Sequence, residues 1–331
     1  MNEASHISGL IKQLRSQEQV LIEVIVVDGG SNDDTVVFAK NEGARIIETA
    51  AGRGHQMNQG AAIASHERLL FLHADTQLTT PRQFADAIET FERYKSPVAG
   101  HFALTFDTDD EQVQKRLRFF EHKTRYNRPG TFNGDQGLLI NARDFEAIHG
   151  FSETYPFLED PEFADRFLKY GEFITLPHLV RTSARRFEEE GIGQRLTLNT
   201  IIMGMYHIEA ASFFERAPDI YRQHAAEPGH YPIGPTRPIN LRPFLALAQI
   251  CVFQDGFPQG LKRCYRIGRY ATRNFWQIIL LAGLRYKEPD VTLRAFDRYI
   301  KPVTDNPPGH LLGTFVIIVW FFWLKFRASR D

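Results

Sequence analysis

The amino-acid sequence predicts an α/β protein with a mixed sheet flanked by helices and a mainly helical C-terminal extension. Through the first hundred residues, short apolar runs typical of buried strands alternate with segments of helical periodicity. After a proline-rich stretch near residue 230, helical patterns dominate and basic residues outnumber acidic ones. With 331 residues, 43% of them apolar, the chain can bury one large core with an appended region, or two domains of ordinary size.

The first strand and helix are expected within residues 7–41. After a helical opening over residues 7–14, residues 22–27 are β-branched and almost all apolar, as expected of an interior parallel strand. The strand ends in Asp28 and two glycines, which permit a tight turn. Residues 35–41 have the pattern of a helix that Ser31 or Asp33 would cap.

Further units follow at similar spacing. We predict a strand at 44–48, a loop over 52–60, a helix from Ala61 and a third strand at 68–72. This alternation favours a parallel sheet with right-handed crossovers. Beyond Pro97 strands and helices no longer alternate at regular spacing. We expect a strand at 98–106, a charged helix at 111–125 and a short strand at 137–141.

Residues 224–243 contain five prolines, which interrupt any regular helix or strand. We therefore predict a domain over residues 1–223, a proline-rich linker over 224–243 and a helical region over 244–331. Residues 231–331 hold 15 Lys and Arg against 6 Asp and Glu, whereas the rest of the chain is acidic. This asymmetry indicates an acidic body joined to a part that meets an anionic surface, although a merely solvated basic face is the alternative.

The two cysteines, Cys251 and Cys264, are too few for a disulfide framework or a zinc site. No cleavable signal pattern opens the sequence. We therefore expect a reducing, cytosol-facing location.

Three segments carry residues suited to binding a nucleotide diphosphate. Asp28 ends a strand, where ligands bind in open α/β sheets, although an acid followed by glycines is also a common turn. Arg53, between two glycines and before a helix, has the chemistry to meet phosphate oxygens. Asp75 closes the apolar strand at 68–72 and is placed to hold a divalent metal, Mn²⁺ or Mg²⁺, against the diphosphate.

A base is expected near residue 160. Glu159 and Asp160 lie just before an amphipathic helical pattern, where acids are ordinary capping residues. A carboxylate held in a crevice could instead serve as a general base. The polar turn Gly134-Asp135-Gln136-Gly137 has no purpose that its residues alone reveal.

Taken together, the segments 26–33, 52–60, 70–76 and 134–137 with Glu159-Asp160 resemble, in order and approximate spacing, the family 2 glycosyltransferases. The resemblance covers roughly residues 2–222 and looks closest to the bacterial rSAM/selenodomain-associated subgroup. It implies the GT-A fold, a Rossmann-like mixed sheet, and a hexosyltransferase-like activity that uses a nucleoside-diphosphate sugar.

The resemblance also implies roles for single residues. Asp160 would be the general base of an inverting displacement, with Glu159 beside it, and Asp75 would be the metal ligand. The nucleotide would be bound by Asp28, Gly30, Arg53, Gly54, Asn58 and His73. The acceptor side would comprise Asp135 and Gln136, together with the basic pair Arg185 and Arg186.

The sequence departs from the family pattern in two ways. His73 replaces the first acid of the usual Asp-x-Asp element, so metal binding would rest on Asp75, and the imidazole could hydrogen-bond the ribose instead. Family members also have a strand before the segment matched here by Asn2 and Glu3. We therefore expect about ten further residues to precede Met1, judged from ordinary strand and loop lengths.

The basic C-terminal region has two segments suited to a membrane surface. Lys262, Arg266, Arg269 and Arg273 recur at helical spacing, as in an interfacial helix, although a helix packed on the rest of the protein has the same pattern. Residues 311–324 are uncharged and mostly apolar, and cations follow them. As a helix they would extend roughly 21 Å, short of a ~30 Å hydrocarbon core, which favours an interfacial or re-entrant anchor over a span.

The sequence therefore predicts a glycosyltransferase at the cytoplasmic face of the inner membrane, peripheral or monotopic. We expect a lipid or lipid-linked acceptor and no nucleic acid among the partners. Two rivals stay open. One is a catalytically silent, membrane-attached nucleotide-binding protein, and the other a sugar nucleotidyltransferase, which lacks support because no early glycine-rich loop with a lysine is present.

Overall fold

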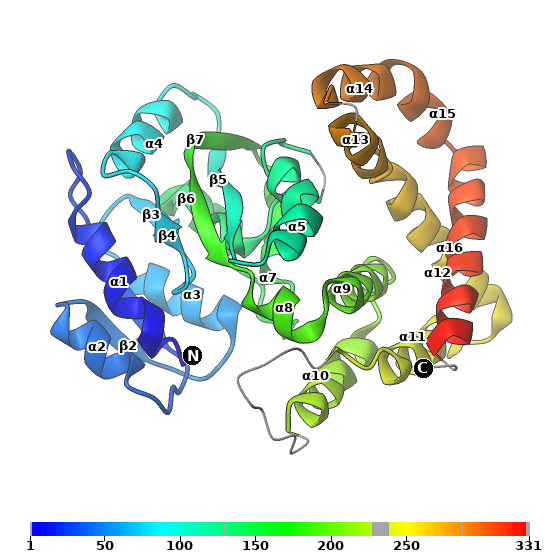
Figure 1. Ribbon diagram of the computed structural model, residues 1–331, viewed down its shortest axis with the longest axis horizontal. Coiled ribbons are helices and arrows are strands. Elements are labelled where there is room, and N and C mark those ends of the chain that lie inside the picture. Colours follow the sequence, from blue (N-terminus) through cyan, green and yellow to red (C-terminus); the bar gives the residue numbers. More distant parts are fainter. Residues whose placement is uncertain (1, 129, 156, 227–237, 286, 329–331) are drawn as a thin grey trace. The chain divides into compact units, whose positions relative to one another are not determined.

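The computed structural model describes residues 2–128, 130–155, 157–226, 238–285 and 287–328 (Figure 1). The chain divides into two compact units, residues 1–183 and 184–331, which are described separately. Most of the predicted linker at 224–243 falls on residues 227–237, outside the described residues. The predicted domain boundaries therefore stay a prediction.

The first unit begins with a small parallel sheet. Strands β1 (Ile25–Asp28) and β2 (Arg45–Glu48) pair in parallel, with Asp28 opposite Glu48. Helices α1 (Ala4–Arg15) and α2 (Thr35–Asn41) contribute Ile7, Ile11 and Ala39 to the core beside it. The predicted helix at 35–41 and the parallel arrangement of the first two strands are confirmed.

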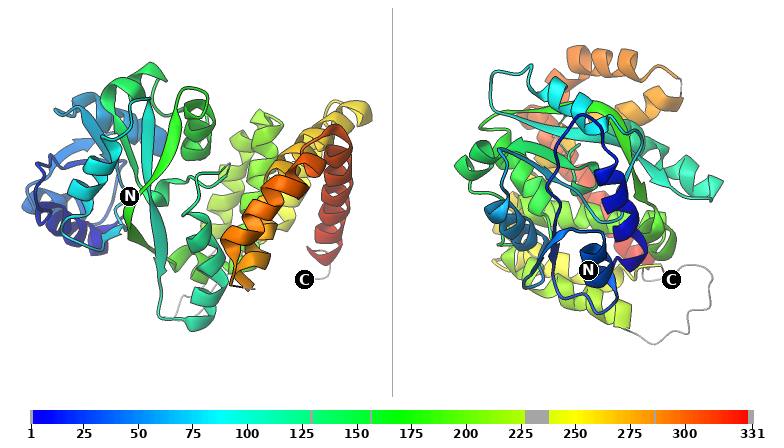
Figure 2. Two further views of the ribbon diagram at one scale, coloured as in Figure 1. Left: turned by 90° about the horizontal axis from the view of Figure 1, so that it is seen from above. Right: turned by 90° about the vertical axis from the view of Figure 1, so that its left-hand side faces the viewer.

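The larger sheet has five strands in the order β3-β6-β5-β7-β4. They are β3 (Arg68–Phe71), β4 (Gln77–Leu78), β5 (Val98–Asp107), β6 (Leu138–Asn141) and β7 (Glu172–Ser183). Only β5 and β7 pair in parallel, and both are seen to run side by side in Figure 2. Because β3 pairs antiparallel with β6, the parallel sheet expected from the first three strands is wrong, whereas the mixed sheet is confirmed.

Helices flank this sheet. Helix α4 (Gln83–Phe91) and helix α5 (Glu111–Lys123) lie beside β5 and β7 in Figure 1, and α6 (Ala142–Ala147) follows β6. The 3₁₀ turn η1 (Gly134–Gln136) precedes β6, and α7 (Glu159–Phe167) precedes β7. Helix α7 includes Glu159 and Asp160 in its first turn, so these acids lie inside the helix and not before it.

Helix α3 spans Arg53–Ile63, which corrects the predicted loop over 52–60 and helix start at Ala61. The glycines of this segment serve close packing. A Cβ atom on Gly60 would lie 3.1 Å from Val27 Cγ2, and one on Gly54 would lie 2.7 Å from the Ser152 carbonyl oxygen. Glycine therefore lets the helix approach its neighbours, a use that a sequence cannot distinguish from a turn.

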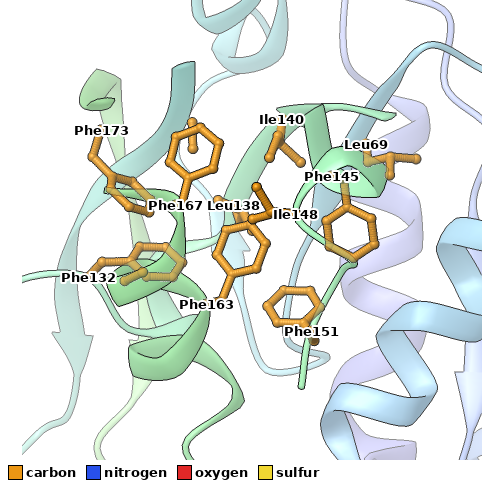
Figure 3. Packing of buried hydrophobic residues seen from close by; sticks show 12 residues of the cluster. Leu69, Phe132, Leu138, Ile140, Phe145, Ile148, Phe151, Phe163, Phe167 and Phe173 are labelled. Carbon is orange, nitrogen blue, oxygen red and sulfur yellow. The ribbon is translucent and has the colours of Figure 1, made fainter. Parts of the chain in front are cut away.

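A cluster of aromatic rings joins α7 to the sheet (Figure 3). Phe163 and Phe167 of α7 are fully buried, and their rings stack with centroids 5.9 Å apart. Phe163 also contacts Phe151, with centroids 4.8 Å apart. Burying an aromatic side chain stabilises the fold by about 1.5–3 kcal/mol, so this cluster holds α7 against the sheet.

The regular elements described in the second unit are all helical, which confirms the predicted mainly helical extension. They are α8 (Arg185–Glu190), α9 (Ile192–His207), α10 (Ala211–Ala226), α11 (Arg242–Phe253), α12 (Phe257–Arg273), α13 (Trp276–Arg285), α14 (Pro289–Ala295), η2 (Phe296–Ile300), α15 (Lys301–Thr304) and α16 (Pro307–Ala328).

Helix α16 is longer than expected. It has 22 residues, against the 14 predicted at 311–324, because the helix begins at Pro307 and ends at Ala328. Proline is tolerated in a first helical turn, where its missing N–H would have no partner. Among the described residues, this is the one helix long and apolar enough to cross a membrane.

Candidate functional site

The centre of the candidate site is formed where β3, η1 and α7 meet. His73, two residues after β3, places Nδ1 2.8 Å from Asp135 Oδ1 of η1. The backbone N–H of Gly134 donates a hydrogen bond to Asp160 Oδ2 over 2.9 Å. Three of the segments singled out in the sequence thus converge, although they lie up to 87 positions apart along the chain.

Gly134 leaves space between the Asp160 carboxylate and the His73 imidazole. A Cβ atom there would lie 2.5 Å from Asp160 Oδ2 and 2.7 Å from His73 Nε2, closer than real Cβ contacts allow. His73 Nε2 is buried and has no hydrogen-bond partner in the part of the chain that the structure describes. An unpaired polar atom at such a point can bind a polar group of a ligand or a water molecule.

The start of α7 holds both acids in a buried position. Leu158 precedes them with a left-handed backbone, φ 95°, which turns the chain into the helix. Asp160 is 7% exposed and Glu159 is 3% exposed. Glu159 Oε1 lies 3.5 Å from Arg53 Nη1, and the Arg53 side chain is 46% exposed. Glu159 is therefore a partner of Arg53, and Asp160 is the acid that faces the site centre.

The environment shifts the proton affinities of these groups. Burial, followed by repulsion from Glu159, raises the pKa of Asp160 to about 6. Burial and the charge of Arg53 lower the pKa of His73, but the hydrogen bond to Asp135 and the nearby carboxylates outweigh them and leave it raised. Desolvation lowers the pKa of Arg53, but the carboxylates, led by Glu159, outweigh it and raise that pKa.

A small pocket opens beside this centre. Its polar end is formed by His73, Gly134 and Asp160, and its apolar walls by Met57, Phe71, Phe132, Leu138 and Phe151. With a volume of about 10 Å³, the pocket has room for one water molecule beside His73 and Asp160.

Asp75 lies in the turn after β3 and is half-buried. Its carboxylate makes no hydrogen bond or ion pair with any described residue. No group of three or more His, Cys, Asp or Glu able to hold a metal occurs in the described ranges. Mg²⁺ and similar hard cations are nevertheless often held by one or two carboxylates and by the phosphates of the substrate. A free carboxylate at Asp75 fits a metal of that kind.

Asp28 is buried at the end of β1 and is bound by its own loop. Its Oδ2 accepts from the backbone N–H groups of Gly30 and Ser31 over 2.8 and 2.7 Å, and its Oδ1 accepts from the Ser31 hydroxyl over 2.5 Å. Although burial alone would raise it, these hydrogen bonds lower the pKa of Asp28. Gly30 has φ 96°, which favours glycine. The predicted nucleotide contacts of both residues stay predictions.

The side chains of Asn58 and Gln136 make hydrogen bonds to other residues of the protein. The Asn58 side chain accepts from the Phe151 N–H and donates to the Phe151 carbonyl, both over 2.9 Å. The Gln136 amide is fully buried, hydrogen-bonded to His101 Nδ1 over 2.8 Å, and accepts from the Asn133 N–H. Gln136 therefore secures the turn and offers no exposed amide to an acceptor.

Asp135 is 44% exposed and reaches the site centre through His73, whereas Arg185 and Arg186 begin α8 in the second unit. The structure thus brings Asp135, His73, Asp160, Glu159 and Arg53 together. Sequence reasoning missed the packing role of Gly134 and the clamp between Asn58 and Phe151. The Gly-Asp-Gln-Gly motif was a signal for the first, whereas nothing local in the sequence indicates the second.

Comparisons with known proteins show what parts of this chain are similar to. The sequence model of glycosyl transferase family 2 matches residues 1–149. An uncharacterized glycosyltransferase of Mycobacterium tuberculosis (strain ATCC 25618 / H37Rv) is 35% identical over 111 residues, which cover 32% of this chain and 42% of that protein. The 4,4'-diaponeurosporenoate glycosyltransferase of Staphylococcus haemolyticus is 29% identical over 100 residues, covering 28% of this chain and 26% of that protein.

The match thus spans less than half the length of these relatives. Among solved structures, a mannosyltransferase from Pyrobaculum calidifontis in complex with GDP-Man and Mn²⁺ is similar over 96% of this chain and 84% of that chain, with 16% identity and a TM-score of 0.44. The subgroup predicted from the sequence stays a prediction. Residues 1–149 thus match glycosyl transferase family 2, the family that the sequence motifs resemble.

Proposed function

We propose that this protein transfers a sugar from a nucleoside-diphosphate donor to an acceptor hydroxyl, in one inverting displacement with Asp160 as the general base. The observation that carries this proposal is the buried Asp160 carboxylate, held by the Gly134 N–H beside an unpaired imidazole nitrogen. Residues 1–149 of the same chain match the model of glycosyl transferase family 2. A base is most effective when its pKa lies near the working pH. A pKa of about 6 leaves Asp160 ionised at neutral pH and basic enough to take a hydroxyl proton.

The donor diphosphate would enter a site that already carries several negative charges. Asp135, Glu159 and Asp160 are acidic, and Arg53 is a permanent cation whose charge acts on Asp160. A divalent metal held by Asp75 would supply positive charge to the diphosphate as the leaving group departs. Arg53 would bind phosphate oxygens directly, because almost half of its side chain is exposed although it is paired with Glu159.

The acceptor would be a lipid or a lipid-linked molecule. One relative bears a name that describes glycosylation of 4,4'-diaponeurosporenoate. The excess of basic residues in 231–331 and the apolar helix α16 support attachment to the cytoplasmic face of a membrane.

Donor binding and donor hydrolysis test this function together. We expect titration calorimetry to detect one of UDP, GDP or dTDP, more tightly with Mn²⁺ than without it. The matching nucleotide sugar should be hydrolysed slowly in water, and Asp160→Asn should abolish hydrolysis while the dissociation constant of the donor stays within a few-fold. Nucleotide binding without any turnover would favour the catalytically silent alternative. No binding of any nucleotide would contradict the proposal.

A further inference from the structure

Helix α16 presents an apolar face that the other described residues leave uncovered. Leu312, Phe315, Val316, Val319, Phe322 and Phe326 are each between 51% and 65% exposed. At about 100° per residue these positions all fall on one side of the helix and therefore form one stripe along it. Contiguous apolar surface of this kind marks a binding surface for a partner or a membrane.

The opposite face of α16 packs on α12 through small residues. A Cβ atom on Gly268 would lie 2.3 Å from Thr314 Oγ1, and one on Gly313 would lie 2.6 Å from Thr272 Cγ2. The two backbones are thus in close contact, with no room for larger side chains. His310, on the packed side of α16, is 8% exposed and shares a hydrogen bond with Tyr265 of α12 over 3.4 Å. Because of this contact, α16 cannot enter a membrane without carrying α12 with it.

Helix α12 carries five cations, which are Lys262, Arg263, Arg266, Arg269 and Arg273. Arg263, Arg266 and Arg273 each pair with an acid. Lys262 and Arg269, seven residues apart on one face of the helix, have no acidic partner among the described residues. Cations at hydrocarbon depth are strongly unfavourable, whereas next to anionic headgroups they are attracted.

Length alone would let α16 cross a membrane, since 22 residues extend roughly 33 Å. Gly313 and Thr314, where α16 contacts α12, lie about 10 Å from the N-terminal end of α16. If α16 spanned the bilayer, Arg269, next to Gly268, would therefore reach hydrocarbon. A helix lying in the plane avoids this, because its apolar stripe enters the acyl region while the helix behind it stays at the headgroups.

We propose that α16 lies in the plane of an anionic lipid bilayer, inserted by its apolar stripe in one leaflet, with the unpaired cations of α12 at the headgroups. This proposal specifies the membrane attachment given under the proposed function and does not depend on sugar transfer. Trp323 and Arg327, near the C-terminal end of α16, supply the aromatic and cationic groups typical of the membrane interface.

Depth measurements on the full chain test the orientation. Single tryptophans are placed at Leu312, Val319 or Phe326, each in a protein that also carries Trp320→Phe and Trp323→Phe. Trp276 is 1% exposed and remains as a constant, protected background. The quencher is brominated lipid in vesicles of phosphatidylglycerol and phosphatidylcholine, with bromine at a shallow or a deep acyl position.

We expect all three tryptophans to be quenched more by the shallow bromine and to about the same extent. A tryptophan at 319 that is quenched most by the deep bromine, with 312 and 326 shallow, would show a span and overturn the proposal. Equal absence of quenching at all three positions would overturn it as well.

Vesicle binding tests the two surface features separately. Phe315→Glu with Phe322→Glu should weaken binding at least tenfold, whereas Leu168→Glu, a matched exposed apolar site in the first unit, should leave it unchanged. Lys262→Gln with Arg269→Gln should weaken binding by about fivefold per cation on anionic vesicles and have no effect on pure phosphatidylcholine. Donor hydrolysis in vesicle-free solution should be equal in all these variants, so that a failure of attachment is distinguished from a failure of catalysis.

Discussion

Replacing the candidate base should make the protein more stable at neutral pH. Burial and the neighbouring Glu159 raise the pKa of Asp160 from 3.8 to about 6, so its ionised form is disfavoured in the folded protein. A difference of about two pH units corresponds to roughly 3 kcal/mol of folding free energy. Asp160→Asn removes the charge but keeps an oxygen for the Gly134 N–H, and the neutral hydrogen bond is weaker. We therefore expect a net gain of about 1–2 kcal/mol at pH 7.5.

The pH dependence of the free energy of unfolding follows from proton binding by Asp160. Between about pH 4 and pH 6 the folded protein holds a proton on Asp160 that the unfolded chain has released, so the free energy of unfolding falls as the pH rises through this window. Below pH 4 both states are protonated, and the advantage of the variant should vanish. Urea unfolding of both proteins at pH 7.5 and pH 4 measures the difference, in which the titrating groups that do not interact with Asp160 cancel.

Asp28→Asn is the matched control for this argument. Its hydrogen bonds outweigh burial and lower the pKa of Asp28, so removing that charge should destabilise the protein at pH 7.5. A stability gain for Asp160→Asn that persists unchanged at pH 4, or no gain at either pH, would refute the reasoning. Gains of this kind are common where function requires a strained or buried charge.

Other substitutions test single features of the site. Gly134→Ala should lower the rate of donor hydrolysis about 100-fold and cost about 1–3 kcal/mol of stability, because the methyl group displaces Asp160 and His73. Gly9→Ala, where nothing lies within 4 Å, is the control, and equal activity of the two variants would contradict a positioning role. Asp75→Ala should abolish the enhancement of nucleotide binding by Mn²⁺ in calorimetry and leave metal-free binding unchanged; retained enhancement would remove Asp75 from the metal site. Asn58→Ala should cost about 2 kcal/mol in urea unfolding, because both backbone groups of the buried Phe151 lose their partner, and an unchanged midpoint would show that the clamp is dispensable.

Local sequence signals predicted the elements whose causes are local. The helix at 35–41 matches residue for residue. The strand predicted at 98–106 differs from β5 by one residue, because its apolar run agrees with its burial. The segment 52–60 was misjudged because its glycines pack a helix against Val27 and Ser152, which lie at positions distant in sequence. The antiparallel pairing of β3 with β6 likewise depends on residues 70 positions away, which no periodicity reveals.

The same distinction applies to the site. The acids at 159 and 160 and the His73-to-Asp75 segment stood out because polar residues follow apolar runs. The sequence could not show which of the two acids, Glu159 or Asp160, pairs with Arg53 and which faces the pocket. Glu159 turns to Arg53 and Asp160 to Gly134, a difference of about 100° around one helical turn that decides which acid faces the pocket.

The loop after β1, residues 28–31, is closed by hydrogen bonds to Asp28, and nucleotide binding would have to open it. A base that hydrogen-bonds Asp28 Oδ1 would first have to displace the Ser31 hydroxyl, so an opening step would accompany association. The observed association rate would then level off at high nucleotide concentration, at the rate of opening, instead of rising linearly. The apparent dissociation constant would exceed the intrinsic one by the inverse of the open fraction. A slow, saturable on-rate would thus be a property of three residues, Asp28, Gly30 and Ser31.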